Sequence, residues 1–118
     1  MKIVDRAAFL KMSENTLFSY YAPKYFSGLC VKLETSKSGN DFYYQDLIGN
    51  VKSESDTDFI AQTNRLEAGE SIDFDFDCSE REGLYREAQM FMIYEPTDLL
   101  GLYKTIIKCA TSHPDFKK

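Results

Sequence analysis

The chain has 118 residues, of which 43% are apolar and 14% aromatic, so it is long and hydrophobic enough to fold without a disulfide framework. Its formal net charge of −5 argues against the cationic groove that nucleic-acid binders need, and no apolar run reaches the length of a transmembrane helix. We predict a single domain over residues 1–118 with a polar tail at 113–118, without direct nucleic-acid binding and without membrane contact.

The first half of the chain predicts a short helix followed by three strands. Asp5 is a suitable N-cap for a helix over residues 6–12, which contain good helix formers. Aromatic, β-branched or alternating apolar residues predict strands at 16–21, 29–34 and 42–47. Because a polar turn separates the last two strands, we expect them to form a hairpin.

The second half predicts two longer helices. Ser55 or Asp56 can cap a helix that runs to about Ala68, and its thin apolar stripe indicates a largely exposed helix. Pro96 can begin the last helix, with stop signals from Ser112 onward. Its apolar residues recur at helical spacing and predict a stripe that faces the core: Leu99, Leu102, Tyr103, Ile106 and Ala110.

Two further strands are expected between these helices, at 71–78 and 89–94. In the first, apolar residues alternate with Asp73, Asp75 and Asp77, which predicts that one face is buried. The second is almost continuously apolar, as is typical of a central strand. The fold class predicted from this order is α+β: a mainly antiparallel sheet of about five strands with two or three helices packed on it.

The three cysteines, Cys30, Cys78 and Cys109, are an odd number and widely spaced, which favours a reduced protein with buried thiols. Cys30 and Cys109 fall in strand and helix patterns and are expected in the core, whereas acidic neighbours should raise the pKa of Cys78. Residues 1–10 lack the apolar stretch of a secretory signal. We therefore expect a cytoplasmic location.

Charge is distributed unevenly along the chain. The segment Glu54–Glu87 holds eleven carboxylates against three arginines, a formal charge of −8, whereas the rest of the chain carries +3. Charge placement of this kind bears on partners and association rather than on chemistry.

Within that segment, Asp73, Asp75 and Asp77 form the sharpest pattern, and three interpretations are open. Oxygen ligands suit Ca²⁺ or Mg²⁺, but an EF-hand loop that begins at Asp73 would need glycine and glutamate where the chain has Cys78 and Leu84. On a strand the three carboxylates repeat at about 6.6 Å, close to twice the phosphate spacing of one DNA strand, so they could mimic a nucleic-acid backbone. The simplest interpretation is the solvated face of an amphipathic strand, and we predict no metal site.

No motif in the sequence predicts catalysis or a cofactor. His113 is the single histidine and has no second histidine for a zinc site, and the glycines form no phosphate-binding loop. Tyr43 and Tyr44 are adjacent, so on a strand they face opposite sides, and exposed tyrosines are enriched in protein interfaces. We therefore expect a binding protein that is not an enzyme and carries no cofactor.

Three stretches of the chain resemble known sequences: MKIVDRAAFL at 1–10, GNDFYYQDL at 39–47, and DFDCSEREGLY with MFMIYEPTDL between 75 and 99. They are similar to short accessory proteins of bacterial prophages and other mobile elements. This resemblance implies no activity and no site residues. It implies a small protein from a phage-like context, where acidic proteins often bind host proteins, including defence machinery that handles nucleic acids.

The function we predict is that of an acidic accessory protein that binds and inhibits a host protein through its basic, nucleic-acid-handling surface, as an anti-CRISPR inhibitor does. The expected contact residues are Asp73, Asp75, Asp77, Glu80, Glu82, Tyr43 and Tyr44. Two alternatives are a small carboxylate- or metal-dependent hydrolase and an accessory protein that self-assembles through its strand edges. The sequence leaves the identity of the partner and the oligomeric state open.

Overall fold

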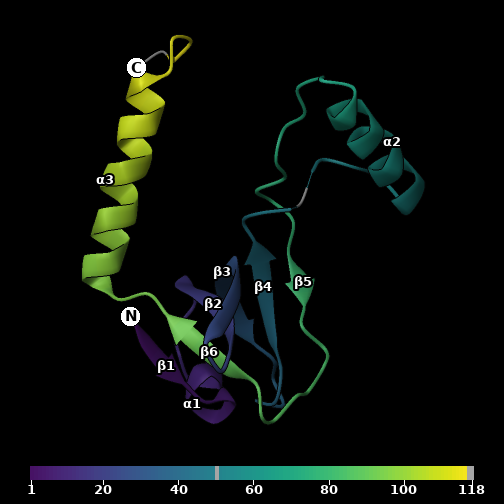
Figure 1. Ribbon diagram of the computed structural model, residues 1–118. Coiled ribbons are helices and arrows are strands. Elements are labelled where there is room, and N and C mark those ends of the chain that lie inside the picture. The colour runs from purple at the N-terminus through teal and green to yellow at the C-terminus, as the bar shows by residue number, and fades with distance from the viewer. Residues whose placement is uncertain (50, 117–118) are drawn as a thin grey trace.

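A six-stranded antiparallel sheet forms the centre of the molecule, and three helices are attached to it (Figure 1). The computed structural model describes residues 1–49 and 51–116. The elements in chain order are β1 (Lys2–Val4), α1 (Arg6–Leu10), β2 (Thr16–Ala22), β3 (Tyr25–Thr35), β4 (Phe42–Asp46), α2 (Asp56–Glu67), β5 (Glu80–Arg81), β6 (Met90–Ile93) and α3 (Pro96–Ser112). The predicted α+β class is confirmed.

The strand order is β1-β6-β2-β3-β4-β5, so the last strand in the sequence lies between the first two. Lys2 pairs with Ile93 on one side of β6, and Phe18 pairs with Ile93 on the other. The predicted hairpin of the second and third strands is confirmed as β3 and β4, in which Cys30 lies opposite Asp46. Both edge strands, β1 and β5, are short, which limits edge-to-edge pairing with other chains.

The core consists of phenylalanines that α1 and the sheet bring together. Asp5 caps α1 by accepting a hydrogen bond from the backbone N–H of Ala8 at 2.8 Å, and Phe9 on this helix is fully buried. The Phe9 ring stacks on Phe91 with centroids 4.0 Å apart and meets Phe18 and Phe42 edge to face. Cys30 and Ile93 complete the cluster, so the prediction that Cys30 lies in the core is confirmed.

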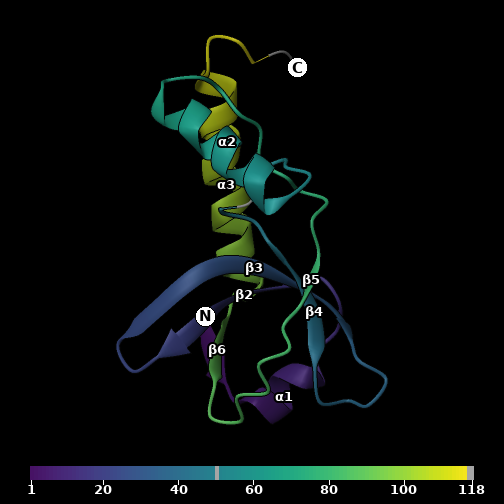
Figure 2. The same cartoon turned by 90° about the vertical axis from the view of Figure 1, so that its right-hand side faces the viewer.

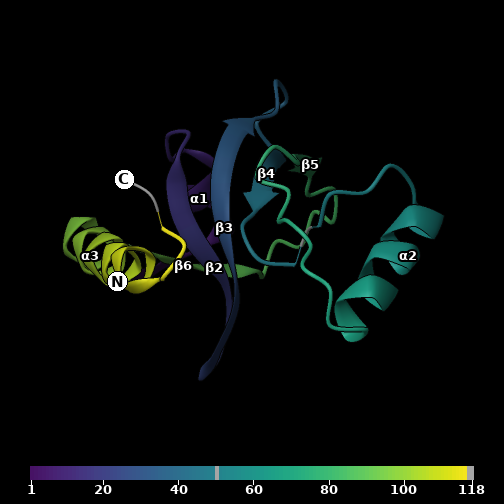
Figure 3. The same cartoon turned by 90° about the horizontal axis from the view of Figure 1, so that it is seen from above.

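The two longer helices both extend beyond one end of the sheet, the end opposite α1 (Figures 1 and 2). Seen from above, the two helices are well separated, with the sheet between them (Figure 3). Neither α2 (Asp56–Glu67) nor α3 (Pro96–Ser112) contains a buried residue. The exposure predicted for α2 is confirmed. The core-facing stripe predicted for α3 is wrong, and Cys109 on this helix is exposed rather than in the core.

The strand predicted at 71–78 is also absent. Within that range the structure has one isolated bridge, between Val51 and Phe74, and the chain joins the sheet only at β5. Phe74 and Phe76, which the alternating pattern placed in the core, are 47% and 58% exposed. The position beside β4 is occupied by β5, which pairs opposite Tyr43 and Tyr44, so the alternating segment before β5 lies outside this pair of strands. In the part of the chain that the structure describes, no helix is long and apolar enough to cross a membrane.

Candidate partner-binding surface

The residues between β4 and β5 form a separate lobe beside the sheet. We call residues 51–79 the acidic lobe (Figure 1). It contains α2 and the return segment, residues 68–79, which leads from α2 to β5. Ser55 caps α2 by accepting a hydrogen bond from the Asp58 N–H at 3.1 Å, and Arg65 pairs with Glu70 at 3.2 Å after the helix. The lobe closes through the Val51–Phe74 bridge and a hydrogen bond from Gln45 on β4 to the carbonyl of Phe76.

Acidic and aromatic side chains are exposed together on the return segment of this lobe. Asp73 and Asp77 are exposed, and Asp75 is half-buried and accepts a hydrogen bond from the Asp77 N–H at 3.0 Å. Phe74 and Phe76 project into solvent with ring centroids 5.7 Å apart. The three aspartates are therefore neighbours of an exposed apolar pair and do not form the polar back of a buried strand.

The remaining predicted contact residues are divided between this surface and the sheet. Glu80 is exposed and accepts a hydrogen bond from the Tyr44 hydroxyl at 3.2 Å. Tyr44 itself packs against the core, and burial, followed by the charge of Glu80, raises its pKa to about 12. Tyr43 is half-buried and lies opposite Arg81 in the β4–β5 pair. Glu82 is turned inward, with a side chain only 3% exposed, so it does not share the surface of the aspartates.

Glu82 belongs to a charge cluster that sequence reasoning missed, formed by the buried side chains of Arg6, Asp41 and Glu82 and by Arg81, whose side chain is 52% exposed. Arg81 Nε donates to Asp41 Oδ2 at 2.6 Å, and the Arg6 guanidinium lies 3.8 Å from Asp41 and 3.5 Å from Glu82. Burial alone would raise the pKa of Asp41, but hydrogen bonds from Arg81 and from two backbone N–H groups outweigh it and hold the pKa below its ordinary value. Arg6 comes from α1, Asp41 from the β3–β4 turn, Arg81 from β5 and Glu82 from directly after β5, and no local pattern links them.

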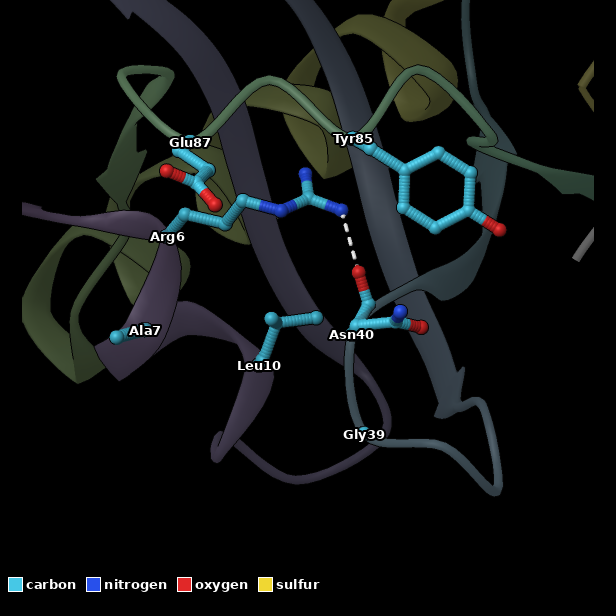
Figure 4. A pocket seen from close by; sticks show the side chains of 7 residues that line it. All are labelled: Arg6, Ala7, Leu10, Gly39, Asn40, Tyr85 and Glu87. Carbon is cyan, nitrogen blue, oxygen red and sulfur yellow. Dashed lines mark hydrogen bonds between the residues drawn. The ribbon is translucent and has the colours of Figure 1, made fainter.

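A cavity of about 580 Å³ opens beside this cluster (Figure 4). Its lining includes Arg6, whose Nη2 donates to the carbonyl of Asn40 at 2.9 Å, and also Tyr85 and Glu87. A buried guanidinium could hold an anion, but Asp41 and Glu82 already balance its charge and Glu87 adds a further carboxylate. The cavity therefore does not favour an anionic ligand.

Two of the three thiols have a raised pKa, which is the opposite of what activates a cysteine nucleophile. Burial raises the pKa of the Cys30 thiol to about 12, and burial together with Glu80 and Asp75 raises that of Cys78, as predicted from its acidic neighbours. His113 caps the end of α3, where it lines a cavity together with the exposed Cys109. Among residues 1–49 and 51–116, no three or more His, Cys, Asp or Glu residues are grouped so that they could hold a metal ion.

Comparisons of the chain with protein-family models, curated proteins and solved structures found no match.

Proposed function

We propose that this protein is a binding protein without enzymatic activity, and that the return segment of the acidic lobe docks on a basic surface of a host protein. The observation that carries the proposal is the joint exposure of Phe74 and Phe76 with Asp73, Asp75 and Asp77. An exposed apolar patch rimmed by charge is typical of interaction sites, whereas a merely solvated segment would keep its aromatic side chains inside.

Each chemical component of this surface has its own role in binding. The carboxylates, with Glu80 beside them, attract a basic partner over distance and speed association. The two phenylalanines supply the apolar area that slows dissociation. A protein that handles nucleic acid exposes basic surface of this kind, so a nucleic-acid-dependent defence protein of the host is the partner class that fits best. Occupying that surface would inhibit it.

The test is capture of partners from bacterial lysate, read by mass spectrometry. Wild type is compared with Asp73→Asn, Asp75→Asn, Asp77→Asn and, separately, with Phe74→Ser, Phe76→Ser. A control with the same change of charge replaces three exposed carboxylates outside the lobe: Glu14→Gln, Glu34→Gln and Asp115→Asn. We expect one host protein that wild type and the control retain and both lobe variants lose. Equal retention by all four proteins would move the interface elsewhere.

The salt dependence of binding provides a second test of the same interaction. Because the proposed contact joins unlike charges at a solvent-exposed surface, affinity for the captured partner should fall as ionic strength rises. The triple Asp→Asn variant should show a flatter salt dependence than the Phe74→Ser, Phe76→Ser variant, which keeps all three charges. Titration calorimetry at low and high salt measures both slopes. A wild-type affinity that does not change with salt would contradict the electrostatic part of the proposal.

A further inference from the structure

Helix α3 exposes an apolar stripe along one half of its surface. The stripe consists of Leu99, Leu102, Tyr103, Ile106 and Ala110. On a helical wheel Lys104, Lys108 and the threonines occupy the opposite half of the helix. Within the stripe, Tyr103 is 65% exposed and Ile106 61% exposed. The stripe itself carries no charge, so a surface that covers it must match it in apolar character.

The sheet has a second apolar surface, on the face opposite the phenylalanine core. Phe18 and Phe91 belong to the core on the α1 side, so the residues next to them on each strand point the other way. The register agrees, since Leu17 lies directly opposite Val31. We call this surface the open face. Its apolar residues on β2, β3 and β6 are Leu17, Leu29, Val31, Leu33, Met90 and Met92.

The strands of the open face have sequences typical of strands that are buried on both sides. β6 is MFMI and the centre of β3 is LCVKL, so both are almost continuously apolar instead of alternating with polar residues. Ser19 also lies on this face, and its hydroxyl is already paired with the Gly28 carbonyl at 2.6 Å and the Tyr94 hydroxyl at 2.7 Å. Neither α2 nor α3 buries a residue, so within the described part of the chain no helix covers the open face.

The connection between β6 and α3 holds the helix away from its own sheet. It consists of two residues, Tyr94 and Glu95, and both are fixed by hydrogen bonds. The Tyr94 N–H donates to the Leu17 carbonyl at 3.2 Å, and the Glu95 N–H donates to the Asp98 carboxylate at 2.8 Å in the capping box of the helix. α3 leads away from the sheet (Figures 1 and 2), so a helix that covers the open face has to come from a second molecule.

The whole chain exposes more surface than a monomer of its size. Its accessible area is 8581 Å², whereas the area–mass relation for monomers gives about 6,600 Å². The radius of gyration is 16.5 Å, against about 13.5 Å for a compact domain of this length. Large homodimer interfaces bury about 1,000–2,500 Å² on each subunit, so an excess of roughly 2,000 Å² per chain is enough to form one.

We propose that the protein is a reciprocal homodimer in which the stripe of α3 in each copy packs on the open face of the other. One chain supplies both surfaces, so a two-fold axis makes the same contact twice and covers both surfaces of each copy, as an isologous interface requires. The sheet then has helices on both faces, and Lys104 and Lys108 remain in solvent. The proposal goes beyond the proposed function because it uses α3 and the sheet, and leaves the return segment to meet another protein.

The test is light scattering after size exclusion, over a dilution series and with reductant present because Cys109 is exposed. Wild type should have twice the chain mass of 13.6 kDa. Ile106→Glu places a charge in the stripe and Val31→Lys places one on the open face, and each should raise the dimer dissociation constant more than tenfold. Lys104→Glu with Lys108→Glu changes the half of α3 that stays in solvent, and this matched control should remain dimeric.

Mixing Ile106→Glu with Val31→Lys distinguishes this dimer from one in which two α3 helices pair. In the mixture, the unaltered α3 of one chain can lie on the unaltered open face of the other, so a heterodimer should form more tightly than either variant dimerises alone. Both variants should keep the wild-type circular dichroism, since Ile106 is exposed and Val31 lies outside the core cluster. A monomeric wild type would overturn the proposal. So would a dimeric Val31→Lys variant, because the stripe would then pack on another surface.

A cross-linking measurement leaves both surfaces unaltered and does not depend on how those variants fold. In Cys78→Ser, Cys109 at the edge of the stripe is the one exposed thiol, because Cys30 is buried, and it can carry a benzophenone cross-linker. Isotope-labelled and unlabelled copies are mixed, irradiated and mapped by mass spectrometry. Cross-links to β2 or β3 of the other copy are expected, whereas cross-links to the other α3 or to the sheet of the same chain would contradict the proposal. The triple Asp→Asn variant should remain dimeric, so failure of the proposed function and failure of the dimer are separable.

Discussion

At the scale of single residues, the most consequential arrangement is the charge cluster of Arg6, Asp41, Arg81 and Glu82, of which Arg81 alone is exposed. It ties α1 and the β3–β4 turn to β5, and so it fixes the point at which the acidic lobe rejoins the sheet. Arg6 Nη1 has no hydrogen-bond partner among the described residues and is held by charge alone, next to Glu82. Such a cluster is costly to break from one side, because the remaining charge stays buried.

Replacing Asp41 with asparagine should lower the free energy of unfolding by about 3 kcal/mol at neutral pH, because Arg6 and Arg81 lose their shared carboxylate. The pKa of Asp41 is below its ordinary value in the folded protein, so its stabilisation is present above about pH 4 and is lost as the pH falls through the lower folded value. Urea unfolding from pH 2 to 7 measures both effects. The acid-side slope should be shallower in Asp41→Asn than in wild type, and an unchanged slope would contradict the role given to Asp41.

At alkaline pH the Cys30 thiol should govern the first loss of stability. Burial raises its pKa to about 12 in the folded protein, whereas an unfolded cysteine ionises near pH 8.5. The unfolded state therefore releases the proton first, and stability falls as pH rises, by roughly 1–2 kcal/mol between pH 8.5 and 10. Cys30→Val should abolish most of this slope. Burial also raises the pKa of Cys78, so a smaller slope should remain in Cys30→Val, whereas an undiminished slope would contradict the assignment.

At the scale of elements, sequence patterns located most helices and strands but misjudged which of them are buried. Strands predicted at 16–21, 42–47 and 89–94 correspond to β2, β4 and β6, and the cap at Ser55 and the start at Pro96 are confirmed. β1, of three residues, was missed because so short a segment carries no periodicity. Alternation at 71–78 and the stripe of α3 were both interpreted as core-facing, since a pattern shows that one face is apolar but not what covers it.

The candidate site was only partly predictable, because a local pattern does not show which distant residues cover a segment. Asp73, Asp75 and Asp77 could be singled out because their alternation is local in the sequence. The exposure of Phe74 and Phe76 could not be predicted, because it depends on which strand pairs with β4. The inward turn of Glu82 depends on Arg6, which is 76 positions away in the sequence.

Two phenylalanine substitutions distinguish the core strand from the exposed segment. Phe91→Ala on β6 removes a fully buried ring that contacts Phe9, Phe18 and Phe42, and should cost about 3–5 kcal/mol of unfolding free energy. Phe76→Ala removes a ring that is 58% exposed and should change stability by less than about 0.5 kcal/mol. Chemical denaturation of both variants checks this. A large loss in Phe76→Ala would mean that residues 71–78 pack as the core strand their alternation predicts.

At the scale of the whole molecule, the proposed binding surface and the core lie in different parts. The sheet with α1 contains every residue of the core cluster, while the acidic lobe and α3 contribute none. Substitutions on the lobe or on α3 should therefore alter binding and association while the fold persists. This separation is what makes the variants proposed for each surface interpretable.

The position of β6 also determines when the protein can fold during its synthesis. β2 can pair with β3 as soon as both are made, but β1 obtains its partner, and β2 its second neighbour, only when Met90–Ile93 is inserted between them. The stacking of Phe9 on Phe91 has the same requirement. The nascent chain must therefore wait with β1 unpaired and Phe9 without its stacked ring until residue 93 has been translated, and a ribosome that stalls before residue 90 would release a polypeptide unable to complete its sheet.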